Sequence, residues 1–382
     1  MIPSANTILL VTGTRPNFIK VAPLLRALAG NPGIRCLLVH SGQHYDANLF
    51  DIFIKELGIP APDYLLDPGS GAASERFGQI LVQFEEIIKE TRPDMVFVVG
   101  DVDTTLAAAL VSRKAGIRLA HLEAGLRSGD RRMPEEINRI MTDSIADHLL
   151  STGKLATDNL LAEGHPVGKT VTVGNIMIVT LWQMQGAIQR STILDRLGLK
   201  PGAYALLTMH RPGNVDSPST LKEILEATAE IAAQMPLVFP IHPRTRKNLK
   251  EFGLWDALQR QPGIILQEPL GYLDFGKLVS SACFVLTDSG GIQEETTVYG
   301  IPCITLRDTT ERPETVSLGT SMLAGSDSKR ILELSAQALS GNWPKGHIPP
   351  LWDGKTAERI VEWLEAITPP RPSPERGGSG VW

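Results

Sequence analysis

The sequence predicts an α/β protein with two doubly wound domains that face each other across a cleft. In each half of the 382-residue chain, short apolar runs typical of buried strands alternate with longer segments of helical periodicity. This alternation favours a parallel sheet that is covered by helices on both faces. The second half repeats the plan of the first half but not its sequence, and the length is sufficient for two domains.

Five strands and at least three helices are expected in the first half. The strands are predicted at Ile8–Val11, Cys36–His40, Met95–Val99, Arg118–Glu123 and His148–Ser151. Helical periodicity predicts helices at Phe77–Glu90, Thr104–Ala115 and Pro134–Ala146. Because helical segments separate these strands, we expect a parallel sheet that is covered on both faces.

The second half has the same organisation. Its strands are predicted at Ala205–Met209, Leu237–Pro240, Ile264–Leu266, Phe284–Thr287 and Cys303–Thr305. Its helices are predicted at Leu221–Gln234, Tyr272–Ser280 and Gly291–Tyr299. The strand–helix alternation again indicates a parallel sheet.

A Gly174-Asn175 pair marks the expected hinge between the domains, since both residues are common where the chain changes direction. We expect a first domain at 1–173 and a second domain at 174–353, which would bind a nucleotide. An amphipathic helix at 354–367 is predicted to return to the first domain. The segment 368–382 is rich in Pro, Gly and Ser, and we expect it to be disordered.

Polar residues follow nearly every predicted strand, at the edge where ligands bind in open parallel sheets. These positions include Asp101, Glu123, His210-Arg211, His242, Asp288-Ser289-Gly290-Gly291 and Arg307-Asp308. Asp101 and Glu123 belong to one strand–helix–strand unit, so their carboxylates are expected to face a common cleft. Repulsion would raise the pKa of one of them, and the pair would then suit proton transfer. The alternative is helix capping or binding of a backbone amide, above all for Asp101.

A further acidic and basic pair opens the helix that begins at Pro134. Glu135 and Arg139 are four residues apart and lie on one helical face. The spacing alone favours an ordinary ion pair between them, worth about 0.2–0.5 kcal/mol.

Two segments suit a phosphate group. Ser289-Gly290-Gly291 leads from a strand into a helix, where free backbone N–H groups and the helix dipole favour an anion. The segment TGTRPNFIK after the first strand adds Arg15 and Lys20. Two cations and backbone amides match a diphosphate. Since the chain has neither a Walker lysine motif nor a GxGxxG fingerprint, a nucleoside-diphosphate sugar fits better than a triphosphate or NAD.

The composition excludes several partner classes. A formal net charge of −5 gives no reason to expect nucleic acid or an anionic membrane as partner. Cys36, Cys283 and Cys303 lie in apolar runs without metal-ligand spacing, so we expect buried thiols in a reducing compartment. Neither a secretory leader nor an apolar run of about 18 residues is present. We therefore expect a cytoplasmic location.

Ten motifs in their order along the chain resemble the non-hydrolysing UDP-N-acetylglucosamine 2-epimerases. They are GTRP at 13–16, GQHYD at 42–46, GDVDTT at 100–105, HLEAGLRSGD at 121–130, MPEEINR at 133–139, GN at 174–175, HRPGNVD at 210–216, HPRTR at 242–246, LTDSGGIQEE at 286–295 and RDTTERPE at 307–314. The resemblance covers about 300 residues, and DSGGIQEE with TTERPE is its most specific part. It implies a GT-B fold, a cytoplasmic homodimer, no metal and no cofactor.

The resemblance also implies roles for individual residues. Those expected to bind the UDP moiety are Arg15, Lys20, His210, Ser289, Gly290, Gly291, Glu295 (through the ribose) and Arg312. Those that match catalytic positions are Asp101, Glu123, Glu135 and His210, with Arg139 beside the carboxylates. The implied reaction eliminates UDP to leave a 2-acetamidoglucal and adds UDP back after C2 is reprotonated on the opposite face. The product, UDP-N-acetylmannosamine, feeds surface polysaccharide synthesis.

Two departures from the family pattern bear on this interpretation. Val179 stands where an acid is common in the segment after Gly174-Asn175, which affects the hinge more than the chemistry. Gln43-His44-Tyr45-Asp46 replaces the glutamine-rich segment of members that substrate activates, so we do not expect such activation.

Three alternatives remain. The first is an epimerase of a modified sugar such as a UDP-2,3-diacetamido-glucuronic acid, in which Arg131 or Arg132 would meet the sugar carboxylate. The second is a GT-B glycosyltransferase, which would need an acceptor site. The third is a sugar-nucleotide sensor without catalysis.

Overall fold

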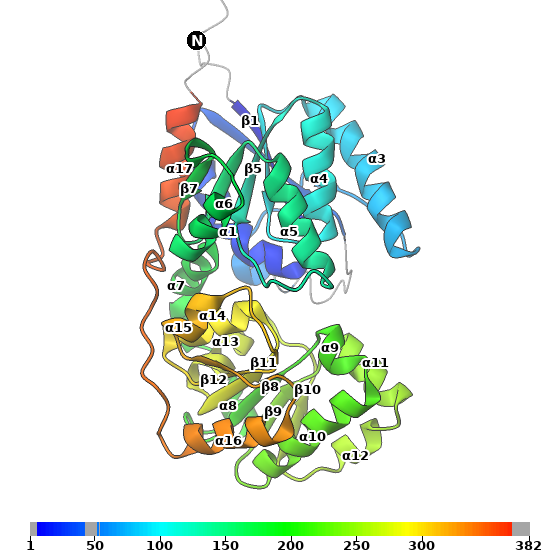
Figure 1. The fold of residues 1–382 in the computed structure, drawn as a ribbon, viewed down its shortest axis with the longest axis vertical. Helices are drawn as coiled ribbons and strands as arrows, with labels where there is room; N and C mark the ends of the chain where they lie inside the picture. The colour runs from blue at the N-terminus through cyan, green and yellow to red at the C-terminus, as the bar shows by residue number, and fades with distance from the viewer. Residues whose placement is uncertain (1–5, 43–51, 53, 369–382) are drawn as a thin grey trace, which may run out of the picture.

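The computed structural model describes residues 6–42, 52 and 54–368, which form two α/β domains, one above the other in Figure 1. Over these residues the first sheet has seven parallel strands in the order β3-β2-β1-β4-β5-β6-β7. Their bounds are β1 Asn6–Thr12, β2 Ile34–His40, β3 Tyr64–Leu65, β4 Met95–Val99, β5 Arg118–Ala124, β6 His148–Ser151 and β7 Thr170–Thr172.

The second sheet has six parallel strands in the described part of the chain, in the order β10-β9-β8-β11-β12-β13. Their bounds are β8 Ala205–Thr208, β9 Leu237–Pro240, β10 Ile264–Gln267, β11 Phe284–Thr287, β12 Cys303–Thr305 and β13 Ser321–Leu323. All ten predicted strands are confirmed. Sequence patterns missed β3, β7 and β13, because two or three residues are too few to display a period.

The predicted helices are also confirmed, with ends that differ by a few residues. The helices of the first domain and the junction are α1 Arg15–Ala29, α3 Ala73–Thr91, α4 Asp103–Lys114, α5 Pro134–Ile145, α6 Lys154–Ala162, η1 Val167–Lys169, α7 Ile176–Gln189 and α17 Thr356–Ile367. Those of the second domain are α8 Ile193–Leu197, α9 Pro212–Val215, α10 Pro218–Ala232, α11 Pro243–Glu251, α12 Trp255–Gln259, α13 Tyr272–Ser281, α14 Gly290–Tyr299, α15 Pro313–Ser317 and α16 Ser328–Leu339.

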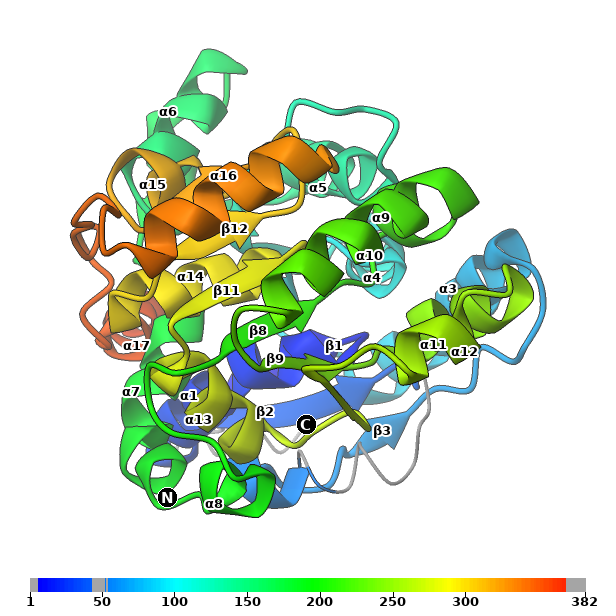
Figure 2. The ribbon, with the colours of Figure 1, turned by 90° about the horizontal axis from the view of Figure 1, so that it is seen from below.

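Each sheet is packed on both faces. In the second domain, side chains of β8 and β11 that point to one face pack with α10 and α16, and those that point to the other face pack with α8 and α13. Figure 2 shows α10 and α16 lying across the first of these faces. In both sheets the strand order reverses at the centre, next to β1 and next to β8. Ligands of doubly wound folds bind at the carboxyl ends of the strands beside this point.

Helix α7 joins the two domains. It packs against α1 and α17 of the first domain and also against α13 and α14 of the second. Gly174, just before it, has a φ of 98°, and a Cβ there would lie 2.5 Å from the carbonyl oxygen of Leu351. Only glycine fits both conditions. The chain after α16 runs back along the molecule to α17, which packs on α1 (Figure 1).

Val179, at the position where an acid is common, lies in α7 and is buried in the same apolar core as Ile176 and Ile360. The expectation for the thiols was partly wrong, because only Cys303 is fully buried whereas Cys36 and Cys283 are half-buried. None of the helices among the described residues combines the length and apolarity needed to cross a bilayer.

Candidate active site

Glu123 lies at the carboxyl end of β5, where the register with β6 shifts. Its φ of 72° is unusual for a residue with a side chain, and such strain is concentrated at functional sites. The buried carboxylate accepts a hydrogen bond from Lys20 Nζ at 2.5 Å and one from Arg312 Nη2 at 3.2 Å. Since Arg312 belongs to the second domain, Glu123 is held by cations of both domains.

Asp101 follows β4, and its side chain is 27% exposed. Its Oδ2 accepts hydrogen bonds from Arg139 Nη2 at 2.6 Å and Nε at 3.0 Å. Burial opposes ionisation, but Arg139 and Lys20 outweigh it and hold the pKa of Asp101 below its usual value. A raised pKa is therefore wrong for Asp101. Helix capping is wrong too, because Val102 occupies the N-cap position of α4.

The expected ion pair between Glu135 and Arg139 is also wrong. The buried Arg139 pairs with Asp101 and with Glu136, the residue after Glu135. Glu136 accepts further hydrogen bonds from the backbone N–H groups of Ser128 and Gly129, so it fixes the loop before α5. Successive residues on a helix point about 100° apart, so only one of two adjacent glutamates can face the interior. The adjacent glutamates at 135 and 136 indicate that one of them is a buried partner of Arg139, but the sequence alone does not distinguish which.

Glu135 points toward the second domain instead. Its Oε1 accepts a hydrogen bond of 3.4 Å from Arg211 Nη1, in the segment that follows β8. Arg211 was predicted only as a strand-end residue, and its contact with the first domain depends on how the two domains dock.

His121 and Asp143 form a buried pair that the sequence analysis missed. This pair holds the strand ends that carry Asp101 and Glu123. His121 Nδ1 lies 2.6 Å from Asp143 Oδ1, and its Nε2 lies 2.8 Å from the carbonyl oxygen of Gly100. Asp143 also accepts a hydrogen bond of 3.0 Å from Gly125 N. The pKa of Asp143 lies below its usual value, because His121 and Arg127 outweigh the opposing effect of burial. These contacts tie the end of β4 to the end of β5.

His210 is oriented by the fully buried Asp288. Its Nδ1 lies 3.0 Å from Asp288 Oδ1, while Asp288 Oδ2 accepts hydrogen bonds from the backbone N–H groups of His210 and Arg211. Burial raises the pKa of Asp288, but His210 and the backbone donors lower it by more. His210 therefore has an acidic partner at the carboxyl ends of β8 and β11.

Gly290 begins α14, one residue before the helix start that the sequence predicted, and Ser289 is its N-cap. A Cβ on Gly290 would lie 2.5 Å from Oε1 of the buried Glu311, whose carboxylate thus lies against the start of the helix. Glu311 Oε2 is 2.6 Å from Arg307 Nη1, and Oε1 is 3.6 Å from Arg211 Nη2. Burial disfavours its charge, but these arginines and Arg139 hold the pKa of Glu311 far below its usual value. The anion beside Gly290 in this structure is thus the Glu311 carboxylate, whose charge these arginines offset.

Glu294 and Glu295 lie in the next turn of α14 and are both buried. Burial raises the pKa of Glu294 to about 7 and that of Glu295 to about 8. For Glu295 the neighbouring Glu294 raises it further, and a hydrogen bond with Tyr272 acts against the rise. Glu294 contacts Arg312, and through it Glu123, so the second turn of α14 is connected to the first domain.

The turn between β1 and α1 brings further predicted residues to the first domain's side of the site. Asn17 accepts hydrogen bonds from the backbone N–H groups of Gly13 and Thr14 and donates one to the carbonyl oxygen of Val99, so it shapes the turn that opens α1. Lys20 follows within the same helix. The side chain of Arg15 and the segment Gln43–Asp46 lie outside the described residues, and their expected roles stay predictions.

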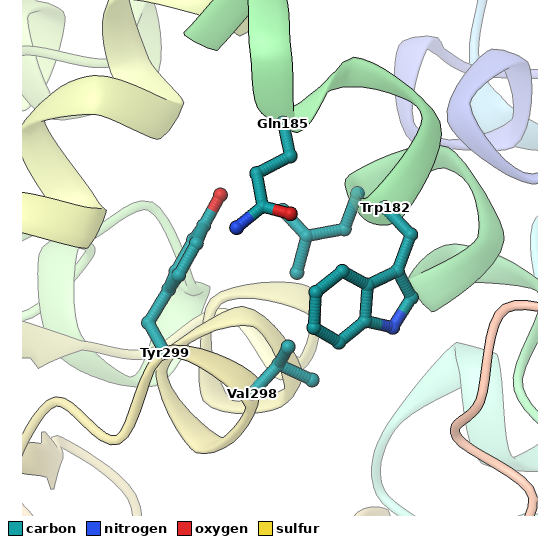
Figure 3. Close-up of a pocket in the computed structure, with 5 residues that line it drawn as sticks. Trp182, Gln185, Val298 and Tyr299 are labelled. Carbon is teal, nitrogen blue, oxygen red and sulfur yellow. The ribbon is translucent and has the colours of Figure 1, made fainter. Parts of the chain in front are cut away.

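A hollow of about 230 Å³ lies elsewhere, between α7 and α14. Its lining is Leu181, Trp182, Gln185, Val298 and Tyr299 (Figure 3). It lies near the carboxyl end of α14, whereas the Gly290 turn is at the amino end. The charged residues of the site do not line it. Among the described residues, no group of three or more His, Cys, Asp or Glu side chains is arranged to hold a metal ion.

Comparison with known proteins agrees with this arrangement. A model of the UDP-N-acetylglucosamine 2-epimerase family matches residues 26–365. The chain is 42% identical to the UDP-N-acetylglucosamine 2-epimerase of Methanocaldococcus jannaschii over 93% of this chain and 98% of that protein. It is 39% identical to the UDP-2,3-diacetamido-2,3-dideoxy-D-glucuronate 2-epimerase of Pseudomonas aeruginosa, over 94% of this chain and 99% of that protein.

Solved structures give the same result. The crystal structure of the Methanocaldococcus jannaschii enzyme in complex with UDP-GlcNAc and UDP superposes with a TM-score of 0.88, covering 94% of this chain and 99% of that chain. The Neisseria meningitidis UDP-GlcNAc 2-epimerase bound to UDP-GlcNAc has 30% identity and a TM-score of 0.86, with 94% and 100% coverage. The two parallel sheets are therefore those of a GT-B fold, and the chain belongs to the UDP-N-acetylglucosamine 2-epimerase family.

Proposed function

We propose that this protein interconverts UDP-N-acetylglucosamine and UDP-N-acetylmannosamine. The observation that carries the proposal is the contact between Glu123 of the first domain and Arg312 of the second, beside Asp101 and its partner Arg139. Carboxylates suited to proton transfer thereby lie next to cations suited to a diphosphate. Both sets come from strand ends, where a doubly wound fold binds its ligand.

In the first step of the proposed reaction, a carboxylate removes the C2 proton while the bond between C1 and the UDP oxygen breaks. The electron pair of the C2–H bond forms the C1–C2 double bond, and UDP leaves with the pair of the C1–O bond. The β-phosphate gains negative charge as it leaves. In this proposal Arg312, His210 and the N–H groups at the start of α14 stabilise that charge.

In the second step, UDP adds back to C1 and C2 receives a proton on the opposite face. Removal from one face and delivery to the other needs two acid–base groups, which supports separate roles for two of the three carboxylates Asp101, Glu123 and Glu135. The glucal intermediate must stay bound and away from water between the steps. The interdomain contact between Arg211 and Glu135 supports a closed arrangement of the two domains during turnover.

The runner-up is an epimerase of a UDP-2,3-diacetamido-glucuronic acid, the substrate named for the Pseudomonas aeruginosa relative. Recognition of a uronic acid requires a cation that faces the sugar. Arg132 is 91% exposed and forms an ion pair with Asp130 of its own loop. This orientation favours the uncharged sugar, and turnover of the two substrates side by side separates the two functions.

We also propose a homodimer, located in the cytoplasm as the sequence suggested. Helices α3, α4 and α5 pack side by side in the first domain (Figure 1). Val82 on α3 is 60% exposed, and Ile137 and Met141 on α5 are exposed apolar residues as well. A second copy that covered them would remove this apolar area from water. Light scattering of wild type and a Met141→Lys variant tests the dimer.

The function itself is tested by NMR with UDP-N-acetylglucosamine alone in D2O. We expect UDP-N-acetylmannosamine to appear and deuterium to enter at C2 in both sugars. A glycosyltransferase or a sensor leaves C2 protonated, so the absence of deuterium at C2 would overturn the proposal. Asp256→Asn, which changes an exposed carboxylate on α12, is the control for Asp101→Asn, because both changes remove one negative charge.

A further inference from the structure

The side chain of Asn175 connects the domain junction to the second domain. Asn175 is fully buried and caps α7 by accepting a hydrogen bond of 2.9 Å from Met177 N. Its Nδ2 donates a hydrogen bond of 2.8 Å to Glu294 Oε1. The residue that begins the joining helix is therefore bound to a carboxylate of α14.

The same oxygen of Glu294 lies 2.6 Å from Arg312 Nε, in an ion pair that is buried on both sides. Arg312 Nη2 in turn donates to Glu123 Oε1 at 3.2 Å, and Glu123 binds Lys20 through its other oxygen. Contacts thus run without interruption from the junction through Glu294 and Arg312 to a carboxylate of the proposed active site. The members belong to both domains and to the segment between them.

We propose that Glu294 is a positioning residue, which holds Arg312 against Glu123 and makes this contact depend on the geometry of the domain junction. The inference rests on the proposed function, because it assigns Glu294 a task in the same reaction. Glu294 has an exposed fraction of 0%. It is therefore placed to act through Arg312 rather than by touching the sugar.

The physical basis is the number of carboxylates that share Arg312. A buried guanidinium needs counter-ions, and here Glu294 and Glu123 divide it between them. Without the charge of Glu294, Arg312 loses the anchor on its Nε side and is free to follow Glu123 alone. The Glu123 carboxylate is then either displaced from its position or bound more tightly by Arg312. Displacement moves it away from the proton at C2, and tighter binding makes it a weaker base, so proton transfer becomes slower in both cases. Arg312 keeps its charge and its partner Glu123, and the Gly290 turn is unchanged, so binding of the diphosphate should change little.

Glu294→Gln keeps the shape of the side chain and removes its charge, while Asn175→Ser keeps the helix cap and removes the amide donor. We expect Glu294→Gln to lower kcat by roughly 10-fold or more with KM within about 3-fold of wild type. Asn175→Ser should lower kcat less. The double variant should be no slower than Glu294→Gln, because both changes interrupt one path. Glu333→Gln, in an exposed ion pair with Arg330, is the control and should match wild type.

Three results would overturn the proposal: an unchanged kcat for Glu294→Gln, a loss confined to KM, or losses that multiply in the double variant. UDP titration by calorimetry shows that each variant is folded. If Glu294→Gln does not fold, Glu294→Asp is used in its place, since it keeps the charge but shortens the reach to Arg312 and should also lower kcat. Deuterium entry in the wild type is measured first. Its absence refutes the proposed function, whereas normal exchange in wild type and Glu294→Gln alike refutes only the role of Glu294.

Discussion

The protonated carboxyl group of Glu295 gives the stability of this protein a distinct pH dependence. Glu295 is buried, and its pKa is raised from 4.5 to about 8 by burial and by the neighbouring Glu294, against a hydrogen bond with Tyr272. A folded-state pKa above the unfolded value means that the native protein keeps a proton which the unfolded chain releases. The stabilising contribution is thus fully present below about pH 4.5 and is lost as the pH rises through about 8.

The size of the effect follows from the width of this pH window. Between pH 5 and pH 8 the unfolded carboxyl group is mostly ionised and the native one mostly protonated. Each pH unit then lowers the free energy of unfolding by up to about 1.4 kcal/mol, so the whole window accounts for at most about 4 kcal/mol. Glu294, with a pKa of about 7, contributes in the same direction.

Glu295→Gln removes this titration but keeps the volume of the side chain. We expect the variant to lose less stability than wild type between pH 5 and pH 8, by up to about 4 kcal/mol. The assay is urea unfolding of the ligand-free protein at intervals of half a pH unit. Glu333→Gln, an exposed carboxylate, is the control and should follow wild type. Parallel curves for Glu295→Gln and wild type would show that Glu295 is ionised in the folded protein and refute the reasoning.

Asp101→Asn should lower kcat by about 10²- to 10⁴-fold, the range for a lost acid–base group, while UDP affinity measured by calorimetry stays within a few-fold. A normal kcat would remove Asp101 from the reaction. Gly290→Ala should weaken UDP binding about 10-fold or more, because its methyl group would lie 2.5 Å from Glu311 Oε1 at the helix start that favours an anion. Undiminished affinity would mean that this turn does not hold the phosphates. Gly125→Ala should lower the free energy of unfolding by about 2–4 kcal/mol, since its φ is 82° and a Cβ would clash with the carbonyl oxygen of Ala156. A denaturation midpoint equal to that of wild type would contradict it.

Local patterns in the chain were sufficient for the longer strands and for the helices that were predicted. Strands such as Met95–Val99 and Phe284–Thr287 coincide with the predicted ranges, because a buried parallel strand is apolar at every position. The Ser289-Gly290-Gly291 turn was recognised because a strand, two glycines and a helix follow one another within ten residues. Asp101 and Glu123 were placed near each other because the ends of adjacent parallel strands lie at one edge.

By itself, then, the sequence determined the α/β architecture, the family motifs and the group of side chains available for chemistry. Only the tertiary structure decided which partner each side chain has. Arg139 binds Asp101, 38 residues away, instead of Glu135 in the adjacent turn, and Arg312 binds Glu123 across 189 residues. Periodicity describes neighbours within one helix or strand, whereas these ion pairs depend on how sheets, helices and two domains pack together. Burial then sets the cost of each unpaired charge, so the packed interior selects the pairing.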